Sequence, residues 1–429
     1  MTAHFAERSI AESALAREFE ATRGLSRSPR RAAAFSRFLE QGLPTRRNES
    51  WHYTDLRAAM RDAAPLAPAP DVETIEAARQ ILQARKPIGV GRLVLVNGAV
   101  VTELCQRFPE SVVFIRETPP SADIDDAMVA LNEAMSSDAG TLRVSDGAAL
   151  SDPVEIIHLI VGERAQATYS RLAITVGVGA KADFIEDYVG ATPGVQRNAS
   201  TVLTLAEKAK VKHVVMLDDK ADLHIESQVA ELAARAELNA FALVAGGALT
   251  RRQLFVRLAG EQATIALGGL ALVDGARRAD TTLQVNHKAA GGTSREWYRA
   301  IVDDDGVGVF QGKVIVEKAA QKTDGAMKSQ AILLSPQAQM NAKPELEIFA
   351  DDVACGHGAT IGSLDPEQLF YLQARGIPRA EAESILLEAF GGEAIDRIDD
   401  QRLIEPLRAA LGAWLATGRG KATSMRTLK

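Results

Sequence analysis

The hydrophobic positions of this chain change their spacing twice along its length. Up to about residue 42, apolar residues recur at helical intervals, as at Ile10, Leu15 and Phe19 and again at Phe35 and Phe38. Alanine and charged residues fill the positions between them, as on a helix with one buried face. This pattern predicts helices that dock on a larger body.

A short polar segment with clustered aromatics follows this helical start. Trp51, His52 and Tyr53 lie together within residues 44–56, where they either pin the entry to a helix or form a binding platform. Three prolines between residues 63 and 70 predict an extended linker. A helix is predicted from about residue 72 to 84, and Asn97–Gly98 between two apolar runs predicts a β-hairpin.

Between about residues 140 and 342 the helical spacing disappears, and short apolar runs alternate with Gly, Asp and Asn. Similar segments begin near Val154, Ala182, Val211, Ala236 and Ala263, at intervals of 28, 29, 25 and 27 residues. A repeat of this length without helices predicts a solenoid in which each turn contributes several short strands. A β-sandwich with frequent turns is the competing interpretation.

The last 65 residues return to helical spacing. Asp365 and Pro366 are suited to begin a helix that stops at Gly376, a second helix is expected from Pro378 to Gly391–Gly392, and a third from Gln401 to Ala416. The apolar residues of the first two are Leu369, Phe370, Leu372, Ile385, Leu386 and Phe390. Such helices either cover the end of the solenoid or bind a partner, and the sequence leaves both open.

Composition narrows the class of protein. The chain has 429 residues, of which 46% are hydrophobic, and a net charge of −7, which argues against nucleic acid or an anionic membrane as the main partner. It opens with no secretory signal pattern and contains no apolar run of about 18 residues, so we expect a cytoplasmic protein. Its two cysteines, Cys105 and Cys355, match no disulfide or zinc spacing.

The most distinctive chemistry lies in residues 343–363. An apolar strand pattern ends near Phe349, and Gly356 and Gly358 predict a loop after it that exposes Cys355 and His357. In an extended backbone these two side chains point the same way, about 6.5 Å apart, and could share one soft metal. Since zinc and iron–sulfur centres take about four ligands, the others would come from Asp351 or Asp352, a small molecule or another chain. A buried cysteine beside a loop histidine is the plainer alternative.

Other candidate motifs are incomplete. The glycine pairs lack the third glycine of a nucleotide fingerprint, and Gly420–Lys421 is followed by alanine, so we expect no nucleotide to bind this chain. Residues 303–306 fail the spacing of a calcium loop. His158 and His287 are isolated, and structural roles are expected for both.

Beyond these patterns, the block from Lys343 to Ile377 resembles the SufD branch of the SufB/SufD family, which takes part in SUF iron–sulfur cluster assembly. The similarity includes residues 308–324 and 44–56, and is weak between about 60 and 150. It implies a right-handed parallel β-helix core at residues 86–350, flanked by two helical regions. The N-terminal region comprises residues 1–85, and the C-terminal region, residues 351–429, carries the Cys355–His357 loop and the docking helices. The chain departs from the family pattern after His287, where members often have Pro, His or Cys. Here residues 289–292 are Ala-Ala-Gly-Gly, which puts any ligand role of His287 in doubt.

The resemblance also implies a function. Members form a non-catalytic scaffold in the SufBCD complex, pair with SufB through the β-helix and bind the ABC-type ATPase SufC through the C-terminal helices. Iron or a transient cluster shared with SufB would be handled by His357 and Cys355, and a homodimer is expected when the chain is alone. Two alternatives remain, a cytoplasmic β-helix enzyme acting on carbohydrate, for which no paired carboxylates are recognisable, and a metal-free structural homodimer.

Overall fold

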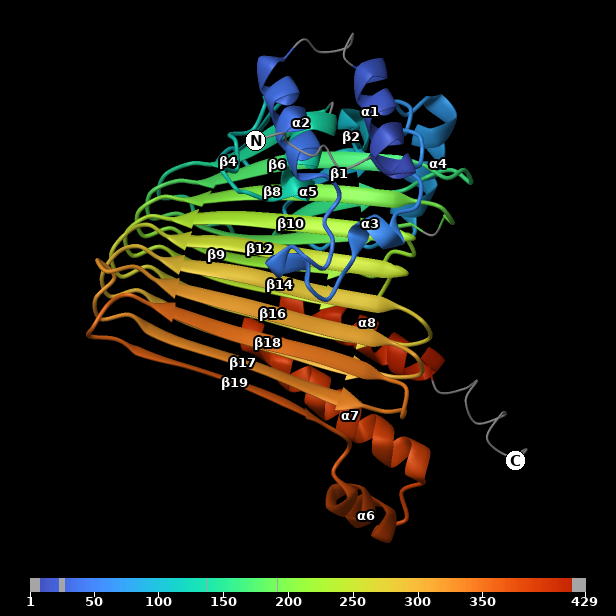
Figure 1. The fold of residues 1–429 in the computed structure, drawn as a ribbon, viewed down its shortest axis with the longest axis vertical. Coiled ribbons are helices and arrows are strands. Elements are labelled where there is room, and N and C mark those ends of the chain that lie inside the picture. The colour runs from blue at the N-terminus through green and yellow to red at the C-terminus, as the bar shows by residue number, and fades with distance from the viewer. Residues whose placement is uncertain (1–7, 23–27, 137, 191, 419–429) are drawn as a thin grey trace, which may run out of the picture.

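Two parallel β-sheets stack into a flattened solenoid that forms the body of the molecule (Figure 1). A computed structural model describes residues 8–22, 28–136, 138–190 and 192–418. Each turn supplies one strand to each sheet, and strands two apart in sequence pair in parallel. The fold is therefore the predicted parallel β-helix, although each turn holds two strands of mostly 8–10 residues rather than several short ones.

The strands alternate between the two sheets along the chain. The ten-stranded sheet contains β1 (Gly91–Val96), β2 (Ala99–Val100), β5 (Val154–Leu159), β7 (Lys181–Val189), β9 (Lys210–Leu217), β11 (Glu237–Val244), β13 (Thr264–Val273), β15 (Thr293–Val302), β17 (Asp324–Leu333) and β19 (Ala354–Gly362). The nine-stranded sheet contains β3 (Val112–Ile115), β4 (Ala139–Val144), β6 (Ala167–Val176), β8 (Gln196–Leu205), β10 (Leu223–Leu232), β12 (Leu249–Leu258), β14 (Arg278–His287), β16 (Val307–Val316) and β18 (Gln339–Ile348).

The register confirms the repeat but shifts some of its anchor points. Ala182 pairs with Val211 as the intervals predict, whereas Val154 pairs with Phe184 and Val211 with Leu238. The predicted hairpin is present, because β1 and β2 pair antiparallel across Asn97 and Gly98, both with positive φ.

Helices cover the outer faces of both sheets. The helices of the described chain are α1 (Ile10–Thr22), α2 (Pro29–Gln41), η1 (Glu49–Trp51), α3 (Leu56–Ala59), α4 (Val72–Gln83), η2 (Thr102–Leu104), α5 (Ala127–Met135), α6 (Pro366–Ala374), α7 (Arg379–Ile395), η3 (Asp396–Ile398) and α8 (Gln401–Gly418). Of these, α6 projects beyond the end of the solenoid and does not take part in the cover. The helices α1, α2 and α5 share an apolar cluster with the nine-stranded sheet, and α7, η3 and α8 share one with the ten-stranded sheet. The molecule is thus layered, with helices on both sides of a two-sheet solenoid.

The aromatic segment at residues 51–53 is part of this helical cover. Trp51 is buried, its Nε1–H donates to Asp126 at 3.0 Å, and the guanidinium of Arg251 lies 3.7 Å from its ring centroid. Of the two interpretations of this segment, the structure favours an aromatic anchor rather than a binding platform.

The second C-terminal helix is longer than predicted. It does not stop at Gly391–Gly392 but continues to Ile395, where α7 crosses the sheet. A side chain at Gly391 would approach Leu411 to 2.9 Å and Leu270 to 3.2 Å. This glycine therefore permits close packing among α7, α8 and β13 instead of ending the helix.

Candidate functional site

Cys355 and His357 lie on the last strand of the solenoid, at its open end. The sequence predicted a glycine-rich loop here, but residues 354–362 form β19, which pairs in parallel with β17. The prediction failed because an outermost strand obtains its hydrogen bonds from its neighbour, so Gly356 and Gly358 need no packed side chains. Neither glycine would meet another atom within 4 Å if it carried a Cβ.

The strand register places each of the two residues in line with a column of residues at the same position on earlier turns of the solenoid. Cys355 pairs with Gly325, which pairs with Ser294, and His357 pairs with Met327, which pairs with Glu296. Met327 and Ser294 are buried, so both columns lie on the inward face of the ten-stranded sheet. Cys355 and His357 therefore share a face directed toward the solenoid axis.

The two side chains differ in environment. His357 is exposed and makes no hydrogen bond or ion pair within the described ranges, whereas Cys355 is half-buried against the interior apolar cluster. Burial raises the pKa of the Cys355 thiol, and the carboxylates of Asp324 and Glu296 raise it further. The sulfur is therefore protonated at neutral pH, and a bound cation would have to displace that proton.

The neighbouring aspartates do not complete the site. Asp351 and Asp352 are both exposed, and the carboxylate of Asp352 forms an ion pair with Lys322. No group of three or more His, Cys, Asp or Glu side chains placed to hold a metal occurs in the part of the chain that the structure describes. Cys355 and His357 are thus a pair of candidate ligands without the others that a metal requires.

Two interior residues near this pair, Ser294 and Glu296, were not singled out from the sequence. A Cβ at Gly325 would lie 3.4 Å from both Cys355 Sγ and Ser294 Oγ, so the glycine leaves a gap between thiol and hydroxyl. Glu296 is fully buried, and neither of its oxygens has a hydrogen-bonding partner of good geometry among the described residues. Only the strand register reveals these residues, because they precede Cys355 by about two turns.

A separate polar chain crosses the interior farther from the open end. Glu186 accepts from Nε2–H of His158 at 2.8 Å and of His213 at 3.1 Å, and Gln228 donates to Nδ1 of His213 at 2.8 Å. Burial opposes the charged form of Glu186, but the hydrogen bonds from both histidines lower its pKa well below the usual value. Arg252 continues the chain by donating to Gln228 and Glu226.

Both isolated histidines are buried, but only His158 has a hydrogen bond from its ring within the described segments. His158 is held by Glu186, and His287 is fully buried with no hydrogen bond to either ring nitrogen within the described segments. Burial lowers the pKa of His287 to about 4, so this imidazole is neutral. Neither is accessible from the solenoid surface.

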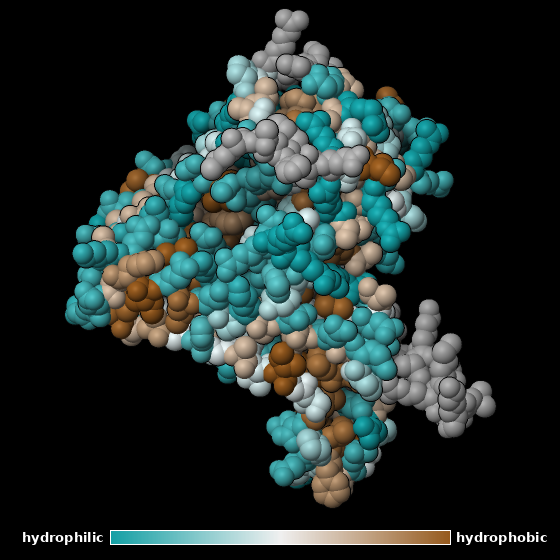
Figure 2. Space-filling model, in the orientation of Figure 1, coloured by the Kyte–Doolittle hydropathy of each residue, from teal (hydrophilic) through white to brown (hydrophobic). Residues whose placement is uncertain are grey.

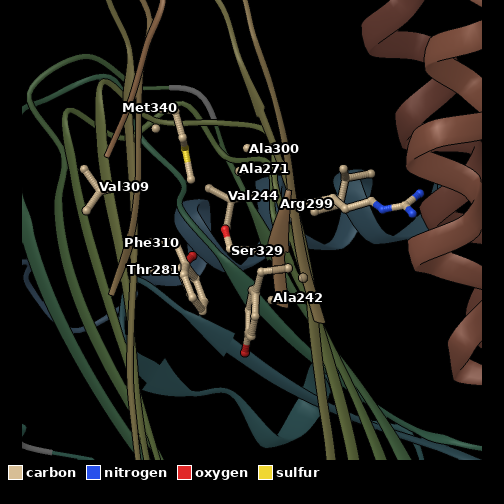
Figure 3. A pocket seen from close by; sticks show the side chains of 14 residues that line it. Ala242, Val244, Ala271, Thr281, Arg299, Ala300, Val309, Phe310, Ser329 and Met340 are labelled. Atoms are coloured by element: carbon tan, nitrogen blue, oxygen red, sulfur yellow. The ribbon is translucent and has the colours of Figure 1, made fainter. Parts of the chain in front are cut away.

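A cavity between the two sheets of the solenoid is too small for a substrate. In Figure 3, Phe310 and Met340 from one sheet face Ala242, Ala271, Ala300 and Ser329 from the other. Val309 points away from the interior on its own sheet, and Arg299 points away toward the helices. The volume of the cavity is about 20 Å³, which is room for about one water molecule. The open end is therefore the better candidate site.

The predicted docking residues divide into exposed and packed groups. In α6 no residue is buried, Phe370 is 72% exposed, and Leu369 and Leu372 are half-buried. Hydrophobic side chains gather over this helix, which projects beyond the solenoid (Figure 2).

In α7, Ile385 is 40% exposed and Leu386 is half-buried. Phe390 instead packs against the ten-stranded sheet, with the Arg299 guanidinium 4.5 Å from its ring centroid. The exposed apolar surface is therefore centred on α6.

Comparison with known proteins identifies the family. The model of the SufBD core domain, described as SUF system FeS cluster assembly, matches residues 158–390, which is more than half of the chain. This chain belongs to the SufBD family.

Full-length relatives support a SufD-type member of the family. The chain is 29% identical to iron–sulfur cluster assembly protein SufD of Escherichia coli over 415 residues, covering 93% of this chain and 96% of that protein. It is 28% identical to a SufBD family protein of Synechocystis, over 83% of this chain and 84% of the relative. It is 26% identical to the chloroplastic protein ABCI7 of Arabidopsis thaliana, over 86% and 82%.

The family match places the chain in the SUF system of iron–sulfur cluster assembly. It covers both the interior polar chain and the last strand, so the open-end pair lies within the SufBD core. Within the described ranges, no helix is long and apolar enough to cross a membrane.

Proposed function

We propose that this SufD-type chain is a non-catalytic, cytoplasmic scaffold subunit whose open end pairs with SufB. His357 and Cys355 would supply part of a site for ferrous iron or a nascent cluster, and SufB would supply the remaining ligands. The observation that carries this proposal is an exposed imidazole beside a half-buried thiol on the inward face of the last strand. The strand β19 also has an unpaired edge, which favours pairing with a second chain.

The proposed ATPase-docking surface is α6 with the adjoining side of α7. A helix with no buried residue and an exposed phenylalanine favours a partner over a capping role. Only residues 363–365 separate β19 from α6. Movement of α6 by SufC would therefore act on the strand that carries Cys355 and His357. Such movement requires that SufC with ATP bound and SufC without it favour different positions of α6.

The iron-site proposal is tested on the complex reconstituted with SufB and SufC. We expect His357→Ala and Cys355→Ala to reduce bound iron and acid-labile sulfide, measured after anaerobic loading. Thr360→Ala is the matched control, because Thr360 is exposed on the same strand but alternates to the outward face. Unchanged iron and sulfide in both site variants would refute the ligand roles.

The docking proposal is tested by affinity for SufC. Phe370→Asp should weaken binding at least about tenfold, because it places a charge in an apolar contact. The control Gln373→Asp changes an exposed polar residue of the same helix. Equal affinities for the two variants would refute docking through α6.

A homodimer is a second candidate state for the isolated chain, favoured by the same unpaired edge of β19. Sedimentation of the chain with and without SufB separates the two states. If the scaffold proposal is right, SufB converts the homodimer to a heterodimer, whereas a homodimer that persists with excess SufB would contradict it.

A further inference from the structure

A groove on the outer face of the ten-stranded sheet lies beside η3, away from the Cys355–His357 pair. Its volume is about 410 Å³, within the range of small-ligand sites. Ala266 and Gly268 of β13 contribute small residues to its lining, and Asn239, Trp297 and Arg397 contribute polar and aromatic ones. Trp297 alternates with the buried Glu296 and Tyr298, so it projects outward and takes no part in the interior site.

Two cations share the ring of Trp297. The guanidinium carbon of Arg397 lies 3.5 Å from the ring centroid, and Nζ of Lys328 lies 5.4 Å from it. Both residues are exposed, and neither forms an ion pair within the described ranges. Arg397 and Arg295 line the groove, and Lys328 lies next to its lining residue Trp297. Arg295 is paired with Asp324 at 2.6 Å. Two uncompensated positive charges therefore lie together at this groove of a chain that is acidic overall.

The backbone that carries Arg397 is fixed to the sheet. Asn239 donates to the carbonyl of Arg397 at 3.3 Å, Lys212 donates to the carbonyl of Asp399 at 2.7 Å, and Ile398 between them is buried. The guanidinium is therefore held against the indole by both its backbone and its ring contact. Such preorganisation lowers the entropic cost of binding a ligand.

The acidic side chains around η3 are largely engaged elsewhere. Asp396 binds Arg408 through both oxygens, and Asp400 binds Arg402. Asp399 is exposed at the end of the turn. The positive charge of Arg397 is thus not neutralised by a hydrogen-bonded carboxylate of its own segment.

We propose that this groove binds a small dianion that bears carboxylate or phosphate groups. Arg397 covers the indole face, so a flat ring cannot stack there, and the indole instead orients the guanidinium. The N–H edge of a guanidinium fits carboxylate or phosphate oxygens with two parallel hydrogen bonds, and a lysine supplies a second point charge. Arg397 would bind one anionic group and Lys328 the other.

The test is calorimetric titration of the purified full-length chain with succinate and, separately, inorganic pyrophosphate. We expect at least one probe to bind, with affinity falling as salt rises, and Arg397→Gln or Lys328→Gln to weaken it about tenfold or more. Binding of succinate alone identifies a carboxylate site, and binding of pyrophosphate alone identifies a phosphate site. Both results support the proposal.

The matched control is Arg375→Gln, because Arg375 also lies over an aromatic ring, that of Tyr371 on α6, at 4.2 Å. This variant should keep the affinity of the unchanged chain. Absence of binding for both probes at millimolar concentration, or equal weakening by Arg375→Gln and Arg397→Gln, would overturn the proposal. The result does not depend on iron binding, so the scaffold function could fail while this site stands.

Discussion

Cys355 lies opposite Gly325 on the inner face of the last rung of the solenoid, where the missing side chain leaves a gap beneath the thiol. Ser294, one turn deeper, lies on the other side of that gap. The half-buried state of the thiol depends on this glycine, since the sulfur occupies space that a larger residue would need. The sulfur is therefore held at the entrance to the interior rather than on the outer surface.

Replacing Gly325 by alanine should be tolerated. The added carbon would lie at ordinary contact distances from Cys355 Sγ and Ser294 Oγ, and Gly325 does not have a positive φ. The lower entropy of the unfolded chain should raise the free energy of unfolding by up to about 1 kcal/mol, measured by urea titration. Gly325→Leu is the contrasting variant and should destabilise by displacing the thiol. Loss of more than about 1 kcal/mol in Gly325→Ala would contradict this geometry.

Glu296 should make stability depend on pH. Burial raises its pKa to about 7 from 4.5, so the folded chain keeps a proton that the unfolded chain has released. The resulting contribution of Glu296 to the free energy of unfolding is complete below about pH 4.5 and is lost as pH rises through 7. Relative to Glu296→Gln, the unchanged chain should lose up to about 3 kcal/mol of unfolding free energy across this window. A difference that is flat or rises with pH would show that the carboxyl has a compensating partner.

The pair of Arg252 and Glu226 should be strongly coupled. Both side chains are buried and ion-paired, so Arg252→Met would leave the carboxylate uncompensated and cost about 3–5 kcal/mol. Adding Glu226→Met should recover much of that loss, as measured by a double-mutant cycle of unfolding free energies. The control Arg143→Met breaks an exposed pair with Glu117 and should cost less than about 1 kcal/mol. Additive effects at Arg252 and Glu226 would contradict the buried pairing.

Trp51 should anchor the N-terminal cover to the solenoid. Trp51→Phe removes the donor to Asp126 and weakens the contact with Arg251, which should cost about 1–3 kcal/mol. In limited proteolysis, the variant should then be cleaved within residues 44–70 after a shorter digestion time than the unchanged chain. His52→Ala, at the exposed neighbouring position, should leave stability within about 0.5 kcal/mol. Equal protease resistance of Trp51→Phe and the unchanged chain would argue against this anchor.

Sequence patterns predicted the architecture better than the details of the site. The repeat was detectable because Ala182 and Val211 occupy equivalent positions of consecutive turns. Turns of unequal length moved Val154 and Val211 two residues out of register with their expected partners, and spacing alone carries no information on such shifts.

The site was only partly visible in the sequence. The adjacency of Cys355 and His357 is local, so the sequence suggested their shared face. Their position on a strand was missed because pairing with β17 outweighs the low strand preference of glycine. Glu296 and Ser294 were missed because their proximity arises only from stacking across two turns.

The central claim is that SufB covers the Cys355–His357 pair, and the most direct test is the alkylation rate of Cys355. The measurement uses iodoacetamide at mildly alkaline pH, because burial raises the pKa of this thiol, in a Cys105→Ser background that leaves one cysteine. The account predicts that Cys355 reacts when the isolated chain is diluted until sedimentation shows a monomer, and that it becomes protected when SufB is added. Adding SufC without nucleotide should leave the rate unchanged. Equal rates with and without bound SufB would contradict the claim.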